Sequence, residues 1–295
     1  MRYLSIDRRK TLRTLMIIHM NIKHYLTIVT MFFLAAMNLS AKSEYKTVND
    51  IPYRDSAGES AYALERCHLD VYYPVDGIDR PTVVWFHGGG LTGGNKFIPE
   101  ELKNCGYVVV AVNYRLLPKV EIDTCIDDAA AAVAWTIRNI QEYGGAPDMI
   151  YVAGHSAGGY LTAMIGLDKR RLAKYGIDAN SIAGLFSFSG HAICHFNYRE
   201  AKGMKPYQPL IDETAPIYYV RPDAPLFVIV SGDREMELYG RYEENAYFWR
   251  MMKLAGHEET YLYELQGYNH GDMAAPAFHI LKNFIMVRTH LNGSY

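Results

Sequence analysis

The sequence predicts an α/β fold with a mostly parallel central sheet flanked by helices. Several short segments are almost continuously apolar, as expected of strands that are covered on both faces. Segments with helical spacing alternate with them along the chain. The length of 295 residues and the hydrophobic content of 49% allow one large core. No internal repeat or low-complexity linker divides the chain, so we expect one folded domain.

The beginning of the chain has the pattern of a secretory signal. Residues 25–41 read YLTIVTMFFLAAMNLSA, a short apolar core that follows basic residues and ends in small ones. This core is too short for a spanning helix, and the basic region before it is long enough that Met20 is the expected true start. We therefore expect a signal peptide over residues 1–41 and a folded domain over residues 42–295. The mature protein should be secreted or periplasmic, with no membrane partner.

The first half of the domain alternates strands with a helix. Residues 67–74 alternate in polarity like a strand, and residues 81–90 form an apolar run that ends in glycines. Residues 107–115 form a second buried strand. Residues 123–143 have helical spacing and end at two glycines, and residues 149–156 return to a strand that runs into a helix.

The second half repeats this alternation after one irregular region. Residues 191–223 are rich in Tyr and Pro and too long for an ordinary connection. Within them we expect the Tyr-rich segment 198–219 to form a short cap over a cleft. The remaining predicted elements are strands at 181–190, 224–233 and 259–267, and helices at 240–257 and 275–289.

Small residues surround a serine at the end of the strand at 149–156. Gly154 precedes Ser156 by two positions, and Ala157 and two glycines follow it. The simplest interpretation is a strand-to-helix turn in which glycine permits positive φ. The alternative is a strained turn that lifts a nucleophilic hydroxyl clear of the backbone.

Candidate partners for this serine fall at the ends of other strands, where function gathers in parallel sheets. Serine hydrolysis needs a base, an acid that orients it, and donors for the oxyanion. His270 lies between the last strand and the last helix, although a loop histidine can also be a bystander. Asp233 and Glu235 follow the strand at 224–233. The order serine, acid, histidine along the chain fits this chemistry.

A glycine-rich loop, HGGG at residues 87–90, offers backbone donors. Amides of Gly88, Gly89 and Ala157 are the predicted oxyanion hole, because no side chain stands between them and a carbonyl oxygen. Each donor contributes about 3 kcal/mol in comparable sites. A plain flexible loop is the alternative interpretation.

These motifs together resemble a known family. The motifs that carry the resemblance are HGGGLTGGNK (87–96), VVAVNYRLLP (109–118), DDAAAAVAWTIRN (127–139) and GHSAGGYLTAM (154–164). Through them the chain is similar to the hormone-sensitive-lipase-like branch of the α/β-hydrolases over about residues 67–291, nearest to feruloyl and acetyl-xylan esterases and to arylformamidases.

The resemblance implies a position for the acid. In the family it usually lies three residues after the strand-end glycine, and counting from Gly232 this favours Glu235, with Asp233 as the alternative. The chain departs from the family at Leu91, where an aromatic residue usually follows the glycines.

The predicted function is therefore a serine esterase that works through an acyl-enzyme, without metal or cofactor. Export and the resemblance favour acetyl or feruloyl esters on plant polysaccharide. An arylformamidase or peptidase activity, and a non-catalytic binding role on the same scaffold, stay open. HAICH at residues 191–195 has possible ligand spacing, but a structural or substrate-lining role is favoured over metal. The net charge of −2 gives no sign of a nucleic-acid partner. Oligomeric state and disulfides stay undetermined.

Overall fold

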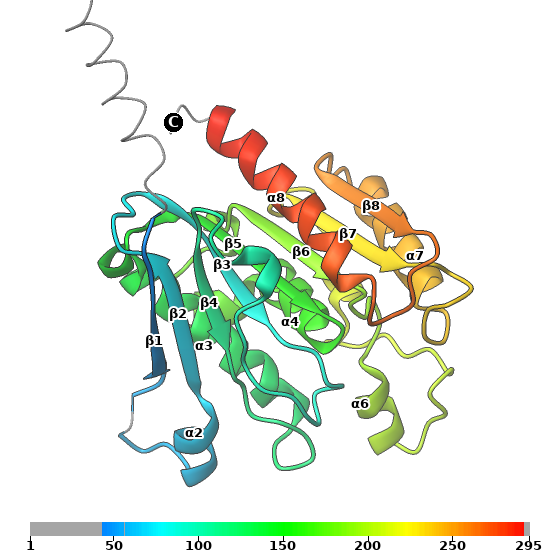
Figure 1. Cartoon of the computed structure of the whole chain (residues 1–295). Coiled ribbons are helices and arrows are strands. Elements are labelled where there is room, and N and C mark those ends of the chain that lie inside the picture. The colour runs from blue at the N-terminus through cyan, green and yellow to red at the C-terminus, as the bar shows by residue number, and fades with distance from the viewer. Residues whose placement is uncertain (1–42, 56, 292–295) are drawn as a thin grey trace, which may run out of the picture. The chain divides into compact units, whose positions relative to one another are not determined.

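An eight-stranded sheet forms the centre of the fold (Figure 1). The computed structural model describes residues 43–55 and 57–291, so the predicted signal peptide lies outside the described residues. The strand order is β1-β2-β4-β3-β5-β6-β7-β8; β2 pairs antiparallel with both of its neighbours, β1 and β4, and β3 to β8 run parallel to one another. The predicted mostly parallel sheet is confirmed. The strands are β1 (Tyr45–Pro52), β2 (His68–Pro74), β3 (Arg80–Phe86), β4 (Val108–Val112), β5 (Gly145–His155), β6 (Gly184–Phe188), β7 (Phe227–Gly232) and β8 (Thr260–Leu265).

Helices cover both faces of this sheet. Because side chains alternate along a strand, Val83 and Trp85 of β3 enter one core and Val84 and Phe86 enter the other. The first core packs against α8, which crosses in front of the strands in Figure 1, and the second packs against α3 and α4. The α-helices are α2 (Ala61–Arg66), α3 (Ile122–Asn139), α4 (Ala157–Leu167), α5 (Lys169–Ala173), α6 (Phe196–Ala201), α7 (Arg241–Leu254) and α8 (Ala274–Leu291). Single 3₁₀ turns lie at η1 (Glu100–Leu102), η2 (Ile140–Tyr143), η3 (Ala179–Ser181) and η4 (Pro216–Tyr219).

The register of the central strands aligns their carboxyl ends at the same end of the sheet. Phe86 pairs with Gly154, His155 pairs with Phe188, and Phe188 pairs with Val230. The loops that follow β3, β5, β6 and β7 therefore start side by side. The loop after β8 joins them, because β8 runs parallel to β7. The sequence predicts the functional residues in these loops, at the carboxyl ends of the strands.

Some elements were not expected from the sequence. β1 is absent from the prediction because its residues are mostly polar and mostly exposed at an outer edge of the sheet. Within the irregular region at 191–223 the chain forms α6, a helix of only six residues, and the turn η4. Whether this region works as a cap stays a prediction.

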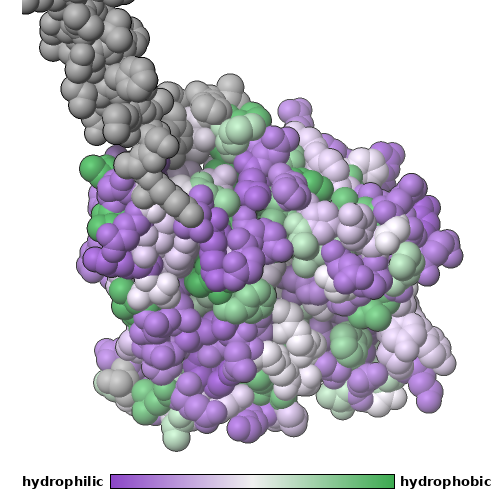
Figure 2. Space-filling view, in the orientation of Figure 1, coloured by the Kyte–Doolittle hydropathy of each residue, from purple (hydrophilic) through white to green (hydrophobic). Residues whose placement is uncertain are grey.

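The surface and the cysteines add two further facts. None of the described helices is both long and apolar enough to traverse a bilayer. On the face displayed in Figure 2, exposed hydrophobic side chains are scattered among hydrophilic ones. The four cysteines, all within the described part of the chain, are free thiols.

Candidate active site

Ser156 occupies a strained turn between β5 and α4. Its φ of 55° and ψ of −115° are rare for a residue with a side chain. Neighbouring glycines make this turn sterically possible. A Cβ on Gly158 would lie 2.0 Å from the carbonyl oxygen of Phe86, and one on Gly154 would lie 2.3 Å from the carbonyl carbon of Gly158. The small residues around the serine are therefore required for packing, and the turn is the strained one expected of an activated serine.

His270 reaches this serine from the loop after β8. Its Nε2 lies 2.9 Å from Ser156 Oγ, although the two residues are 114 positions apart in the chain. The neighbouring His155 faces away from the hydroxyl, since its Nε2–H donates to the backbone oxygen of His270 at 2.7 Å. Burial lowers the pKa of His155 to about 4, so this ring is a neutral support for the His270 loop.

The acid that contacts His270 is Glu237, so the prediction of Glu235 or Asp233 is wrong. His270 Nδ1–H donates to Glu237 Oε2 at 2.8 Å. The Glu237 side chain is only 1% exposed, whereas Glu235 points to solvent. Ser156, His270 and Glu237 thus form one continuous hydrogen-bonded chain.

The loop after β7 explains the error. The carboxylate of Asp233 accepts the N–H groups of Glu235 and Gly267, at 3.0 and 2.8 Å, and so is used to shape the loop. The Asp233 carbonyl accepts the N–H of Glu237 at 2.9 Å, which adds a helical turn before the acid. A Cβ on Gly232 would lie 3.0 Å from Glu237 Oε1, so glycine leaves room for the acid.

Ser189, at the end of β6, is a functional residue that the sequence analysis missed. Its Oγ–H donates to Glu237 Oε1 at 2.6 Å, and Oγ also lies 2.9 Å from His270 Nδ1. Ser189 has a φ of 47° and is fully buried. Burial alone would raise the pKa of Glu237, but hydrogen bonds from His270 and Ser189 outweigh it and lower the pKa to about 2. Glu237 is therefore ionised at neutral pH and holds the proton of His270 on Nδ1. In the sequence, the only signal for Ser189 was its place directly after an apolar strand.

The glycine loop after β3 lies against the serine. A Cβ on Gly88 would be 3.4 Å from Ser156 Cβ, and Gly89 has a φ of 106°. Among the described residues, no backbone acceptor takes the N–H of Gly88 or Gly89, and Ala157 is the first residue of α4, where N–H groups lack intrahelical partners. These three amides are free to serve as donors, which is what the predicted oxyanion role requires.

His87, the first residue of this loop, is buried and held in place by Tyr114. Burial lowers its pKa to about 4, and its ring stacks on Tyr114 with centroids 4.5 Å apart. Tyr114 also donates its hydroxyl proton to the His87 carbonyl at 2.8 Å.

The HAICH segment lies beside the site and is tied to α7. His191 Nδ1–H donates to Glu244 Oε1 at 2.8 Å, and Arg241 donates to His191 Nε2 at 2.7 Å. Arg241 also donates to the carbonyl of Ser189. Within the described chain, no group of three or more His, Cys, Asp or Glu side chains is placed to hold a metal ion. The segment therefore braces the turn that carries Ser189.

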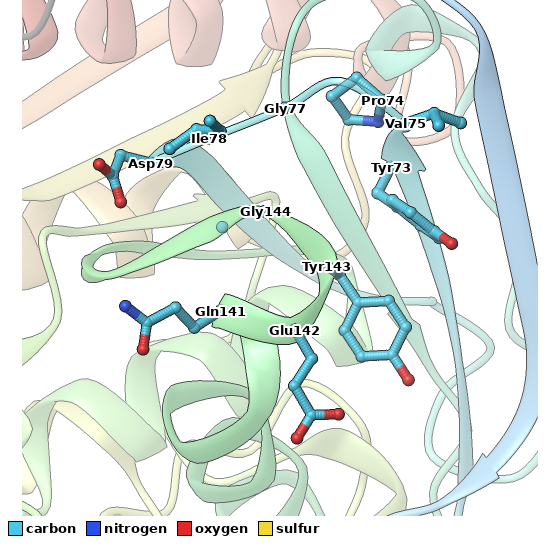
Figure 3. A pocket seen from close by; sticks show the side chains of 11 residues that line it. Tyr73, Pro74, Val75, Gly77, Ile78, Asp79, Gln141, Glu142, Tyr143 and Gly144 are labelled. Carbon is cyan, nitrogen blue, oxygen red and sulfur yellow. The ribbon is translucent and has the colours of Figure 1, made fainter.

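A separate surface pocket of about 290 Å³ lies away from these residues. It is formed by residues 73–75, 77–79 and 141–145 (Figure 3). These residues lie next to the starts of β3 and β5, whereas Ser156 follows the end of β5. Tyr73 and Tyr143 make an edge contact in it, with ring centroids 5.3 Å apart. None of the candidate catalytic residues lines it.

Comparisons with known proteins agree with this architecture. A kynurenine formamidase from Danio rerio is 35% identical over 130 residues, which is 42% of this chain and 40% of that protein. Carboxylesterase NlhH from Mycobacterium tuberculosis is 40% identical over 101 residues, 32% of each chain. The chain thus aligns with less than half the length of these relatives.

Solved structures show the same fold. A truncated carbohydrate esterase from gut microbiota superposes with a TM-score of 0.67 at 16% identity, over 85% of this chain and 98% of that one. The propionate-bound esterase Est2 of Thermogutta terrifontis superposes with a TM-score of 0.63 at 23% identity, over 83% and 94% of the two chains. The BD-FAE family model matches residues 69–238, which is more than half of the chain. The resemblance found in the sequence is confirmed: this chain belongs to the BD-FAE family and has the α/β-hydrolase fold.

Proposed function

We propose that this protein is a serine esterase that hydrolyses carboxylic esters through an acyl-enzyme. The observation that carries the proposal is the hydrogen-bonded chain from Ser156 through His270 to Glu237. The strained backbone of Ser156 supports it, because strain of this kind is retained where function depends on it. A purely binding scaffold has no need of a buried carboxylate that orients the histidine.

The geometry defines the steps. Ser156 Oγ attacks the ester carbonyl carbon while its proton passes to His270 Nε2. The ionised Glu237 stabilises the resulting imidazolium through Nδ1–H. Amides of Gly88, Gly89 and Ala157 receive the oxyanion. His270 then protonates the leaving alcohol, and a water deprotonated by the same nitrogen releases the acid from the acyl-enzyme.

The proposed substrates are acetyl or feruloyl esters on plant polysaccharide, and the proposed location is secreted or periplasmic. Support for the substrate comes from the gut carbohydrate esterase and from a bifunctional GH43-CE of Bacteroides eggerthii, which superposes with a TM-score of 0.66 over 81% of this chain. Support for export comes from the sequence of residues 25–41. A polymer-linked substrate outside the cell would require an exported enzyme.

Amide hydrolysis is the second candidate, favoured by the similarity to a kynurenine formamidase. The same serine, histidine and oxyanion donors can act on a formyl amide. The two functions differ in the acyl group that Ser156 receives and in the leaving group, an alcohol or an amine, that His270 must protonate.

The test is hydrolysis of 4-nitrophenyl acetate, acetylated xylan, methyl ferulate and an N-formyl aryl amide, with Ser156→Ala as control. We expect ester hydrolysis by the native chain and a loss of at least about 10³-fold in kcat in the variant. Equal turnover by the two chains would rule out the proposed nucleophile. Turnover of the formyl amide alone would assign the second candidate function.

A further inference from the structure

The buried guanidinium of Arg199 lacks most of the hydrogen bonds and the ion pair that a buried arginine normally makes. Arg199, in α6, is 4% exposed. Its Nη1–H donates to the carbonyl of Gln208, and its buried Nε–H has no hydrogen-bond partner. No carboxylate of the described residues lies within ion-pair distance of it. Another buried arginine, Arg66, shows the usual situation, because its Nε, Nη1 and Nη2 all donate hydrogen bonds.

Glu244, a buried carboxylate on whose pKa Arg199 acts, already has other hydrogen-bond partners. Glu244 Oε1 accepts Arg241 Nε and His191 Nδ1, each at 2.8 Å, and its Oε2 faces the N–H of Ile193. Burial raises the pKa of Glu244 to about 7 even though Arg241 and Arg199 act against it. The oxygens of Glu244 are therefore taken by Arg241, His191 and Ile193, and neither of them bonds Arg199.

A second unpartnered donor lies in the same place. His195 accepts the N–H of Asn197 at Nδ1, at 3.3 Å, so the neutral ring has its proton on Nε2. That Nε2–H is buried and has no partner. Burial and the nearby His191 and arginines lower the pKa of His195 well below its ordinary value, so this ring stays neutral and offers one N–H.

Contacts connect this region to the catalytic loops. The side-chain amide of Asn197 donates to the carbonyl of Gly90, so the first turn of α6 rests on the glycine loop. The His195 ring meets the His191 ring with centroids 4.7 Å apart. His191 follows Gly190, which packs against the first turn of α4: a Cβ on Gly159 would be 3.0 Å from Gly190 Cα.

We propose that Arg199, assisted by His195, forms an anion subsite beside the catalytic serine, and that the preferred ester substrate carries a carboxylate group. This inference rests on the proposed esterase function. A buried and unpaired guanidinium is unfavourable, and a ligand carboxylate removes that penalty. The free edge of a guanidinium matches the two oxygens of a carboxylate.

Binding at this subsite requires α6 to shift, because both unpartnered N–H groups are covered in the described structure. Since Asn197 links α6 to Gly90, the same shift would reach the oxyanion loop. Recognition of the carboxylate is thereby coupled to the catalytic centre.

The experiment compares kcat/KM within two matched ester pairs. The first pair is mono-4-nitrophenyl glutarate against 4-nitrophenyl butyrate, which places the charge on the acyl side. The second is 4-acetoxybenzoate against methyl 4-acetoxybenzoate, which places it on the leaving group. We expect the native chain to prefer the anionic ester about 10-fold or more in at least one pair, and Arg199→Gln to reduce that preference about 10-fold.

Two further variants control the result. Arg250→Gln removes a positive charge that is exposed on α7, and should leave the preference unchanged. Arg199→Lys keeps the charge without the two-donor edge, and should retain part of the preference. Equal preferences in the native chain and Arg199→Gln, in both pairs, would overturn the subsite.

Two measurements separate this result from failure of the proposed function or of the variant. If no ester is hydrolysed, the esterase proposal fails, and calorimetric binding of glutarate and benzoate to the native chain decides the subsite alone. Circular dichroism shows whether Arg199→Gln folds. If it does not fold, the comparison of variants is replaced by a measurement on the native chain, the inhibition of 4-nitrophenyl butyrate hydrolysis by glutarate and by benzoate. Absence of binding or inhibition by both anions would contradict the inference.

Discussion

At the scale of single residues, both oxygens of the Glu237 carboxylate accept hydrogen bonds from side chains and from the backbone. His270 Nδ1 and Ser189 Oγ donate to it, and so do the backbone N–H groups of Gly232 and Leu238. Hydrogen bonds to an ionised acceptor favour the charged form. The carboxylate is thus fixed in one orientation and stays charged beside His270.

Removing the charge of Glu237 should therefore disable catalysis. We expect Glu237→Gln to lower kcat by about 10³- to 10⁴-fold, because the amide no longer stabilises the imidazolium and its NH₂ faces the Gly232 and Ser189 donors. Hydrolysis of 4-nitrophenyl acetate measures the effect. Glu235→Gln is the matched control and should change kcat less than about 2-fold. A large loss in the Glu235 variant with little loss in the Glu237 variant would contradict the assignment.

Of the serine, the histidine and the acid, the sequence predicted the two that lie next to a strand end, and missed the one that is placed by the path of a loop. Ser156 and His270 were predicted because each lies next to a strand end that the apolar pattern marks. Glu237 was missed because its position depends on a helical turn that Asp233 makes with its own carbonyl and carboxylate. Three acidic residues at alternate positions look alike in the sequence, and only the path of the loop distinguishes them.

At the scale of elements, the loop after β3 depends on one glycine more than on its neighbour. Gly94 has a φ of 102°, and a Cβ there would lie 2.4 Å from His87 Nδ1 and 2.7 Å from the Gly88 carbonyl oxygen. Gly93 has an ordinary φ, and the nearest atom to a Cβ there is 3.9 Å away. Of these two glycines, only Gly94 packs closely against the part of the loop that faces the serine.

Gly94→Ala should thus displace the oxyanion loop, whereas Gly93→Ala should be tolerated. We expect Gly94→Ala to lower kcat for 4-nitrophenyl acetate by about 10²-fold, comparable to the loss of one oxyanion donor. Gly93→Ala should stay within about 2-fold of the native chain. Equal kinetics for the two variants would show that the Gly94 contacts do not set the loop.

Element prediction succeeded where burial was continuous. β3, β4, β6 and β7 are buried along nearly their whole length, so their sequences are almost uninterrupted apolar runs. β1 has no such run because it lies at an outer edge of the sheet, and α6 is too short to show a helical period. Their formation depends on the rest of the fold.

At the scale of the whole molecule, Glu237 should couple stability to pH. The pKa of Glu237 is about 2 in the folded chain, against an ordinary value of 4.5. As the pH falls, Glu237 is therefore protonated in the unfolded chain before it is protonated in the folded chain. The stabilisation is therefore complete above about pH 4.5 and is lost as the pH falls toward 2.

Urea denaturation of the native chain and Glu237→Gln at several pH values tests this coupling. We expect the native chain to be more stable by about 2 kcal/mol at pH 6, and the difference to narrow as the pH falls toward 3. Glu235→Gln, which alters an exposed side chain, should show no such trend. A difference that stays constant over this range would contradict the low pKa.

β8, the strand that precedes the His270 loop, is an edge strand of the sheet. β8 is bonded along one side only, to β7, so it is the natural place for the fold to fray on warming. Because the base follows β8 directly while the nucleophile follows the central β5, fraying would separate the two without opening the interior. Heat inactivation should accordingly set in before the central strands melt, and should reverse on cooling as the margin re-forms.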